Sequence, residues 1–210
     1  MGKCSVVSGK KAPRGCAPVK ICDGKSMDGK TLKDLVVCYT ENCLKNHPGY
    51  NHNNVDFDPL FDDAIQMRWH KRTVMDSHQT QLHKEPREEY LKNLEGQKDA
   101  LRGGTSFEDV YKTMLLCKTD GVAQLTLYDT ALRLCLPRGM KPKDVYLHSG
   151  ARKGAGYIKK LIKNYYPIVP YLPKKNFPPE LQVLESWEIE NFLCVCKDQL
   201  CKLSQVAGGA

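Results

Sequence analysis

A short turn, Gly121-Val122-Ala123, stands between two helical patterns and is the first place where this sequence could do chemistry. Glycine readily adopts the left-handed backbone conformation that a tight turn needs. The start of the following helix carries backbone N–H donors without an intrahelical partner and a partial positive charge, so it can hold a phosphate. A capping pair formed by Thr126 and Asp129 would compete, because its carboxylate would occupy some of these donors and repel a phosphate.

Basic residues gather just after this turn. The chain carries 32 Lys and Arg against 24 Asp and Glu, a formal net charge of +8. Between residues 141 and 175 a single acid, Asp144, faces nine basic residues: Lys141, Lys143, Arg152, Lys153, Lys159, Lys160, Lys163, Lys174 and Lys175. Such clustering is typical of a surface that binds a polyanion, and of nucleic-acid-binding proteins in particular. A solvated lysine-rich face would have the same composition.

The turn and its two flanking helices resemble the helix-hairpin-helix of DNA-repair and recombination proteins. That motif reads Gly-hydrophobic-Gly; here Gly121 and Val122 match it, and Ala123 replaces the second glycine. The resemblance implies that backbone amides of the turn grip a DNA phosphate. The nucleic-acid-binding residues expected on this basis, together with the basic cluster, are Gly121, Val122, Ala123, Arg152, Lys153, Lys159, Lys160 and Lys163. A helical hairpin that only stabilises the fold is the alternative.

The same resemblance raises a second possibility, a base-excision DNA glycosylase. In that superfamily an aspartate after the hairpin, at the start of the next helix, stabilises the sugar cation as the flipped base leaves. Asp144 lies at a suitable distance, near an expected helix start. Asp129 stands in Tyr-Asp-Thr, which is similar to the family's Val-Asp-Thr, but it follows Gly121 by only eight residues. As ordinary structural residues, Asp129 would be a capping carboxylate and Asp144 an acid in the first turn of a helix.

A further resemblance covers residues 107–203 and concerns an uncharacterised bacterial protein family, itself distantly similar to the helix-hairpin-helix glycosylases. It implies a fold with a hairpin-like core and no particular activity. The segments that carry it are Tyr128–Arg133, Asp144–His148, Gly150-Ala151 and Phe192–Cys194 with Lys197.

Helical patterns surround the turn. Thr105 with Glu108, or Ser106 with Asp109, has the spacing of a capping box. Apolar residues then recur at helical spacing on two faces: Phe107, Val110, Tyr111, Met114 and Leu115, and Leu127, Ala131, Leu132, Leu134 and Cys135. Other helices are expected over 58–72 with Asp58 as N-cap, 85–100, 142–148, 151–164, and from a Ser186 N-cap to about 203. The proline-rich residues 165–179 are expected to be extended.

These patterns predict a mainly α protein: a compact helical domain over 56–205 built around the hairpin, and an irregular arm over 1–55 rich in Cys and Lys. The composition, 41% hydrophobic and 27% charged, is that of a globular protein. No apolar run approaches the ~20 residues that span a bilayer, and the basic N-terminus lacks the apolar core of a secretory signal. We therefore expect a cytoplasmic protein without a membrane partner, and the oligomeric state stays open.

Ten cysteines in a chain without a visible signal sequence favour reduced thiols over a disulfide framework. Four of them fall within helical patterns and are expected to be small core residues: Cys117, Cys135, Cys194 and Cys201. Cys38, Cys43, His47 and His52 could supply four zinc ligands, but their spacing matches no standard zinc finger. No metal and no other cofactor is expected.

The leading functional prediction is sequence-independent binding of nucleic acid, in particular DNA, by the turn and the basic stripe together. A glycosylase-like enzyme is the first alternative. A structural helical protein, whose basic stripe meets an acidic protein partner, is the second.

Overall fold

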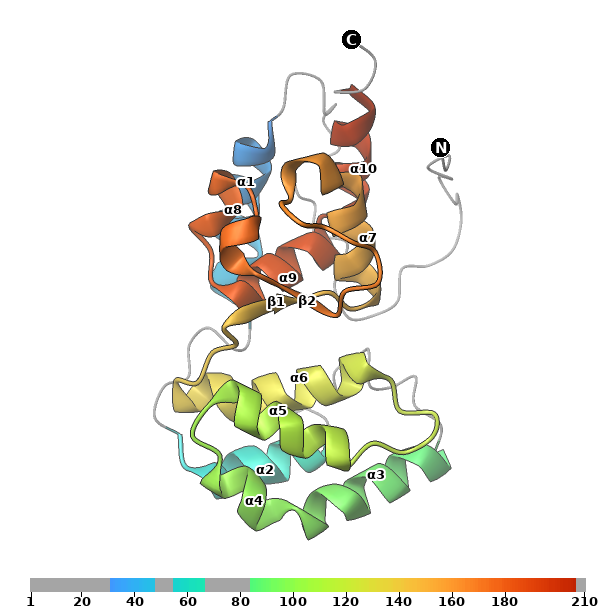
Figure 1. The fold of residues 1–210 in the computed structure, drawn as a ribbon. Helices are drawn as coiled ribbons and strands as arrows, with labels where there is room; N and C mark the ends of the chain where they lie inside the picture. Colours follow the sequence, from blue (N-terminus) through green and yellow to red (C-terminus); the bar gives the residue numbers. More distant parts are fainter. Residues whose placement is uncertain (1–30, 48–54, 67–83, 207–210) are drawn as a thin grey trace. The chain divides into compact units, whose positions relative to one another are not determined.

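The computed structural model describes residues 31–47, 55–66 and 84–206 of the 210. As the sequence predicts, these residues are mainly α-helical (Figure 1). They also contain one small two-stranded sheet, which the sequence patterns did not predict. The helices are α1 (Leu32–Asn42), α2 (Phe57–Ile65), α3 (Lys84–Gly96), α4 (Lys98–Gly103), α5 (Phe107–Leu116), α6 (Gln124–Cys135), α7 (Ser149–Tyr157), α8 (Pro179–Gln182), α9 (Ser186–Val195) and α10 (Lys197–Val206). Short 3-10 helices are η1 (Leu44–Asn46), η3 (Leu136–Arg138), η4 (Lys159–Leu161) and η5 (Lys174–Asn176), and the strands are β1 (Asp144–Tyr146) and β2 (Tyr171–Pro173). Within these ranges, no helix has the length and apolar character required to cross a bilayer.

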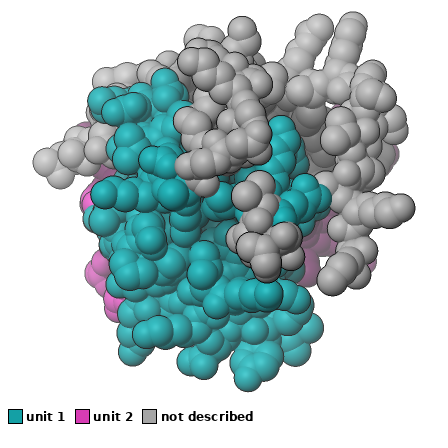
Figure 2. Space-filling view, turned by 90° about the horizontal axis from the view of Figure 1, so that it is seen from above, with its two compact units in different colours: residues 1–45, 145–210 teal, residues 46–144 magenta. Residues whose placement is uncertain are grey.

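The chain divides into two compact units, which Figure 2 colours separately. Unit 1 combines Met1–Lys45 with Val145–Ala210, and unit 2 is the continuous stretch Asn46–Asp144. This partition differs from the expected division into an arm over 1–55 and a domain over 56–205. Helix α1 belongs to unit 1, where it packs against α8 and α10. A capping box between Thr31 and Asp34 starts this helix, so residues 32–42 are regular.

The predicted helical hairpin forms the centre of unit 2, with α5 packed along α6. Ser106 is the N-cap of α5 and accepts a hydrogen bond from the Asp109 amide (3.1 Å), so the second of the two candidate capping pairs is the one used. Phe107, Tyr111 and Tyr128 form an aromatic cluster with ring centroids 5.6–6.1 Å apart. Leu115 is the exception on the predicted apolar face, because it is 41% exposed.

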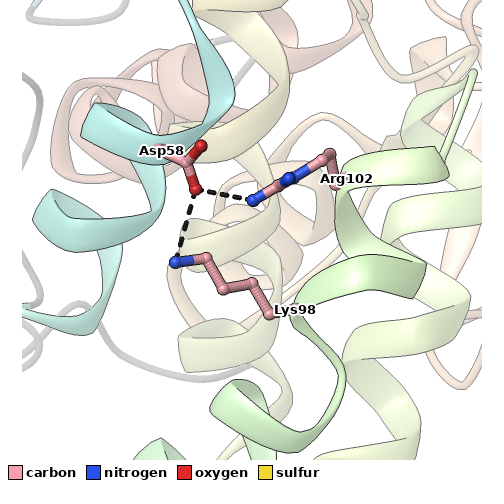
Figure 3. A network of polar contacts seen from close by, with 3 residues as sticks. All are labelled: Asp58, Lys98 and Arg102. Atoms are coloured by element: carbon pink, nitrogen blue, oxygen red, sulfur yellow. Dashed lines mark hydrogen bonds and ion pairs between the residues drawn. The ribbon is translucent and has the colours of Figure 1, made fainter.

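Helix α2 begins two residues earlier than expected. Its N-cap is Asp56, which makes no side-chain capping bond. Asp58, the expected N-cap, instead lies in the first turn, where its Oδ1 is 3.3 Å from Nζ of Lys98 and 2.7 Å from Nη2 of Arg102 (Figure 3). The same lysine also lies over the ring of Phe61. Polar and cation–π contacts thus tie α2 to α4, although the exposure of these groups keeps the energy of each ion pair small.

Helices α7 and α9 pack closely in unit 1. A Cβ atom on Gly154 would lie 2.1 Å from the carbonyl oxygen of Leu193 in α9, so only glycine fits at this crossing. Tyr39 of α1 joins the same core: its ring meets Phe192 edge-on, with centroids 5.4 Å apart, and its hydroxyl accepts a hydrogen bond from Asn191 (2.9 Å). Helix α1 is therefore part of the packed interior of unit 1.

The expected helix over 142–148 is wrong. Residues Asp144–Tyr146 form β1, which pairs with β2, and the Leu147 amide donates to the Pro170 carbonyl (2.8 Å). Val145 and Tyr146 are buried, and both residue types favour strands. Helix α7 then covers Ser149–Tyr157 in place of the predicted 151–164. The proline-rich segment contains β2, η5 and the start of α8, so it is extended only in part.

The last predicted helix is two helices. Glu185, rather than Ser186, is the N-cap of α9 and forms a capping box with Glu188, whose carboxylate accepts from the Glu185 amide (2.8 Å). The helical pattern breaks at Cys196, and α10 follows from Lys197. Two cysteines also differ from expectation: Cys194 is half-buried rather than a core residue, and Cys201 of α10 is disulfide-bonded.

Cys117 and Cys135 are fully buried in unit 2, as expected for small core residues. Burial raises the pKa of the Cys117 thiol to about 11, and its Sγ lies 3.6 Å from the Asn93 carbonyl oxygen as a weak donor. Burial likewise raises the pKa of Cys135. Both thiols are therefore protonated near neutral pH.

We expect Cys117 to resist alkylation in the folded protein. At pH 8 its thiolate fraction should be about 100-fold below that of an ordinary thiol, because burial raises its pKa to about 11. Only the thiolate reacts, so alkylation should be slower by a similar factor. Mass-spectrometric mapping after brief iodoacetamide treatment, with and without urea, measures this. Equal labelling of Cys117 under both conditions would contradict its burial.

Candidate nucleic-acid interface

The turn between α5 and α6 lies at the surface of unit 2. Gly121 has φ +82°, the left-handed conformation predicted for it. Gly121 and Ala123 are exposed, whereas the Val122 side chain between them is buried. A Cβ on Gly121 would also come within 3.1 Å of Pro86, near the start of α3. The buried valine fixes the turn to the core while the backbone on either side faces solvent.

The start of α6 differs from the expectation in a way that matters for anion binding. Ala123 is the N-cap and makes no side-chain capping bond. The predicted Thr126–Asp129 capping pair is wrong, because α6 begins at Gln124 and Thr126 is already a buried residue inside the helix. Thr126 accepts, through its carbonyl, from the hydroxyl of Thr130 (2.8 Å).

No side chain at the N-cap therefore accepts a hydrogen bond from the first backbone amides of α6. The first intrahelical bonds are those from the Thr126 and Leu127 amides to the Ala123 carbonyl. The amides of Gln124 and Leu125 precede these bonds, and the first turn of α6 contains no acid. These two amides have no hydrogen-bond partner in the part of the chain that the structure describes, and together with the positive end of the helix dipole they favour an anion here. Asp120, exposed on the α5 side of the turn, is the nearest acid in sequence.

The glycosylase hypothesis requires an aspartate at the start of the helix that follows the hairpin, and neither candidate lies there. Asp129 is half-buried within α6. Asp144 opens strand β1, so no helix starts at it. Burial raises the pKa of Asp144, the neighbouring Glu108 carboxylate raises it further, and Lys143 acts in the opposite direction. Neither residue has the placement of the superfamily's aspartate at a helix start.

The five basic residues of the predicted interface all belong to unit 1. Two lie on α7, two on η4 and one on the turn after η4. Four of them are exposed: Lys153, Lys159, Lys160 and Lys163. None of the four has an acidic partner in the part of the chain that the structure describes. Arg152 differs, since it is half-buried and donates a hydrogen bond to the Pro167 carbonyl. It holds a loop in place, and its role toward a phosphate stays a prediction.

The structure adds residues that the sequence patterns did not single out. Next to the lysines, four large apolar side chains are exposed: Leu161 (53%), Tyr166 (63%), Ile168 (89%) and Tyr171 (48%). The only indication of this surface in the sequence is the apolar, aromatic run Tyr-Tyr-Pro-Ile-Val-Pro-Tyr in residues 165–171. Periodicity could not reveal which of these side chains face solvent, because the segment is neither a continuous helix nor a continuous strand.

Among residues 31–47, 55–66 and 84–206, no three His, Cys, Asp or Glu side chains are grouped as metal ligands. Cys38 lies on α1 and Cys43 at its C-cap, and His52 of the possible zinc set lies outside the described residues.

Comparison with protein-family models, with curated proteins and with solved structures finds no match. The resemblances to the helix-hairpin-helix and to the bacterial family therefore stay predictions, and functional inference rests on the residues of this chain.

Proposed function

We propose that this protein binds nucleic acid, in particular DNA, without sequence preference. The observation that carries the proposal is the set of exposed lysines, Lys153, Lys159, Lys160 and Lys163, none with an acidic partner in the described residues. The sequence contains no Asp or Glu from 145 to 179, so this stretch has nothing to neutralise the lysines locally. A surface of this kind attracts polyanions, and release of condensed counterions drives the binding.

The turn in unit 2 supplies a second kind of contact. Phosphate can accept hydrogen bonds from the backbone amides at the start of α6, where Ala123 leaves the helix uncapped. Both contacts address the sugar-phosphate backbone, which is the same for every base sequence. Affinity should therefore depend strongly on salt and little on sequence.

The salt dependence of binding tests the proposal. The triple variant Lys159→Gln, Lys160→Gln, Lys163→Gln should bind a labelled duplex more weakly in fluorescence anisotropy. The slope of log K against log salt should become shallower by about one for each lysine that contacts a phosphate.

A matched control separates local contacts from net charge. Lys33, Lys45 and Lys202 are also exposed residues of unit 1, and replacing these three by Gln removes the same total charge. The control variant should keep a slope close to that of the wild type. Identical slopes for the two triple variants, or no DNA binding at low salt, would reject the proposal; retention of a protein partner after nuclease treatment would then favour the acidic-partner alternative.

A further inference from the structure

One surface segment of unit 1 combines positive charge with exposed rings. The loop from η4 to η5 is orange in Figure 1. Its side chains Tyr166, Ile168 and Tyr171 are exposed, and exposed lysines precede and follow them in the sequence: Lys159, Lys160, Lys163 and Lys175. Large side chains this exposed cost free energy in water, because their apolar surface stays hydrated. Three of them within six residues indicate a binding surface.

The backbone of this loop is held at several points. The Lys163 amide donates to the Asn176 carbonyl (2.8 Å), and the Leu147 amide donates to the Pro170 carbonyl (2.8 Å). Arg152 donates to the Pro167 carbonyl between these points. Pro167 lies within a tight turn, in which the Val169 amide donates to the Tyr166 carbonyl (3.2 Å). The loop therefore presents its side chains from a fixed backbone, so little ordering is required when a ligand binds.

Tyr171 is also supported from within. Its ring packs against Tyr146 with centroids 5.5 Å apart and planes tilted by 45°, and Tyr146 stacks on His148 at 6.0 Å and 17°. Tyr146 and His148 are buried, whereas Tyr171 is half exposed. Burial and the neighbouring Arg152 lower the pKa of His148 to about 4, so the row ends in a neutral imidazole at neutral pH. Tyr171 is thus the solvent-facing end of a row of three rings.

Resting on the nucleic-acid function proposed above, we propose that this loop binds single-stranded nucleic acid, with unpaired bases stacked on Tyr166 and Tyr171 and phosphates held by the flanking lysines. Every base has a flat π face, so aromatic side chains bind bases without sequence preference. In a duplex these faces are already covered by neighbouring base pairs. Exposed tyrosines among lysines therefore favour the single strand over the duplex.

The test compares three ligands of equal length: an oligo-dT strand, an abasic strand with the same phosphates, and a duplex. Wild-type protein should bind oligo-dT more tightly than the other two. Tyr166→Ala should weaken oligo-dT binding by about fivefold or more, since stacking on one ring typically contributes a factor of that size or larger. The variant should bind the abasic strand as the wild type does, because no base is present to stack.

Conservative variants guard against misfolding. Tyr166→Phe and Tyr171→Phe keep the rings and should keep the preference for oligo-dT, whereas Tyr171→Ala should reduce it. Tyr166 serves as the main position because the described residues give its ring no aromatic neighbour, so its loss leaves the row around Tyr146 intact.

The possible failures are distinguishable. Equal affinity for oligo-dT and the abasic strand, with salt-dependent binding retained, overturns stacking and leaves the proposed function standing. Absence of binding to all three ligands overturns both. Binding to vesicles of phosphatidylserine and phosphatidylcholine that Ile168→Ser abolishes, with no effect of Tyr166→Ala on oligo-dT, would identify the loop as a membrane-docking surface and also overturn this inference.

Discussion

Replacing Gly154 by alanine should lower the free energy of unfolding by about 1–3 kcal/mol or more, the usual cost of overpacking a core. The added Cβ would lie 2.1 Å from the Leu193 carbonyl oxygen and 2.8 Å from its carbonyl carbon. These are backbone atoms of α9, which cannot rotate away as a side chain can. Helix α7 must therefore move off α9, and the loss of packing outweighs the gain of up to about 1 kcal/mol that alanine brings to a helix interior. Urea denaturation measures the change.

Gly156 in the same helix provides the control. Among the described residues, a Cβ there would meet only the Tyr165 hydroxyl, at 3.6 Å, which is an ordinary contact. Gly156→Ala should consequently leave stability unchanged or raise it slightly through helix propensity. If both variants lose the same stability, the close approach of α7 to α9 is not the cause.

Placing a carboxylate at Ala123 should move stability and DNA affinity in opposite directions. Ala123 has the extended conformation typical of an N-cap (φ −74°, ψ 154°), and it is exposed. Aspartate at this position can accept bonds from the first amides of α6, and its charge is favourable at the positive end of the helix; N-caps of this type typically contribute about 0.5–2 kcal/mol. The same charge would repel a phosphate by about 1 kcal/mol or more at hydrogen-bonding distance, a roughly fivefold or greater loss of affinity.

Ala123→Asn separates the two effects. Asparagine caps a helix about as well as aspartate does but carries no charge, so it should stabilise the fold with a smaller loss of affinity. Thermal unfolding and anisotropy titrations on the same samples give both quantities. If Asp and Asn leave DNA affinity at the wild-type value, phosphate is not held at the start of α6, and the lysines alone remain as the proposed contacts.

Local patterns in the sequence were sufficient to predict the helical hairpin of α5 and α6. The helical recurrence of Phe107, Val110, Tyr111 and Met114 and the Gly121 turn are confirmed, because helix faces and tight turns depend on residues close together in the chain. Helix starts were less predictable. Thr126 and Asp129 have capping-box spacing but lie inside α6, since α6 already begins at Gln124.

Features that depend on distant residues could not be predicted. Strand β1 exists because residues 171–173 pair with it, and that partner is about 25 residues away in the chain. The need for glycine at 154 comes from Leu193, and the sequence around Gly154 contains no sign of it. For the candidate site, the lysines were evident from composition, whereas the support of Tyr171 by Tyr146 required the pairing of β1 with β2.

The discontinuous course of unit 1 has a consequence for how the protein is made. Unit 2 ends at Asp144, so a ribosome completes it while α1 still lacks α8 and α10, the helices against which it packs. The apolar face of α1, with Leu35 and Tyr39, has to wait until translation reaches the last helix. Assembly of unit 1 is thus a later event that joins the segments on either side of unit 2, whereas the hairpin of unit 2 can form as soon as it leaves the exit tunnel.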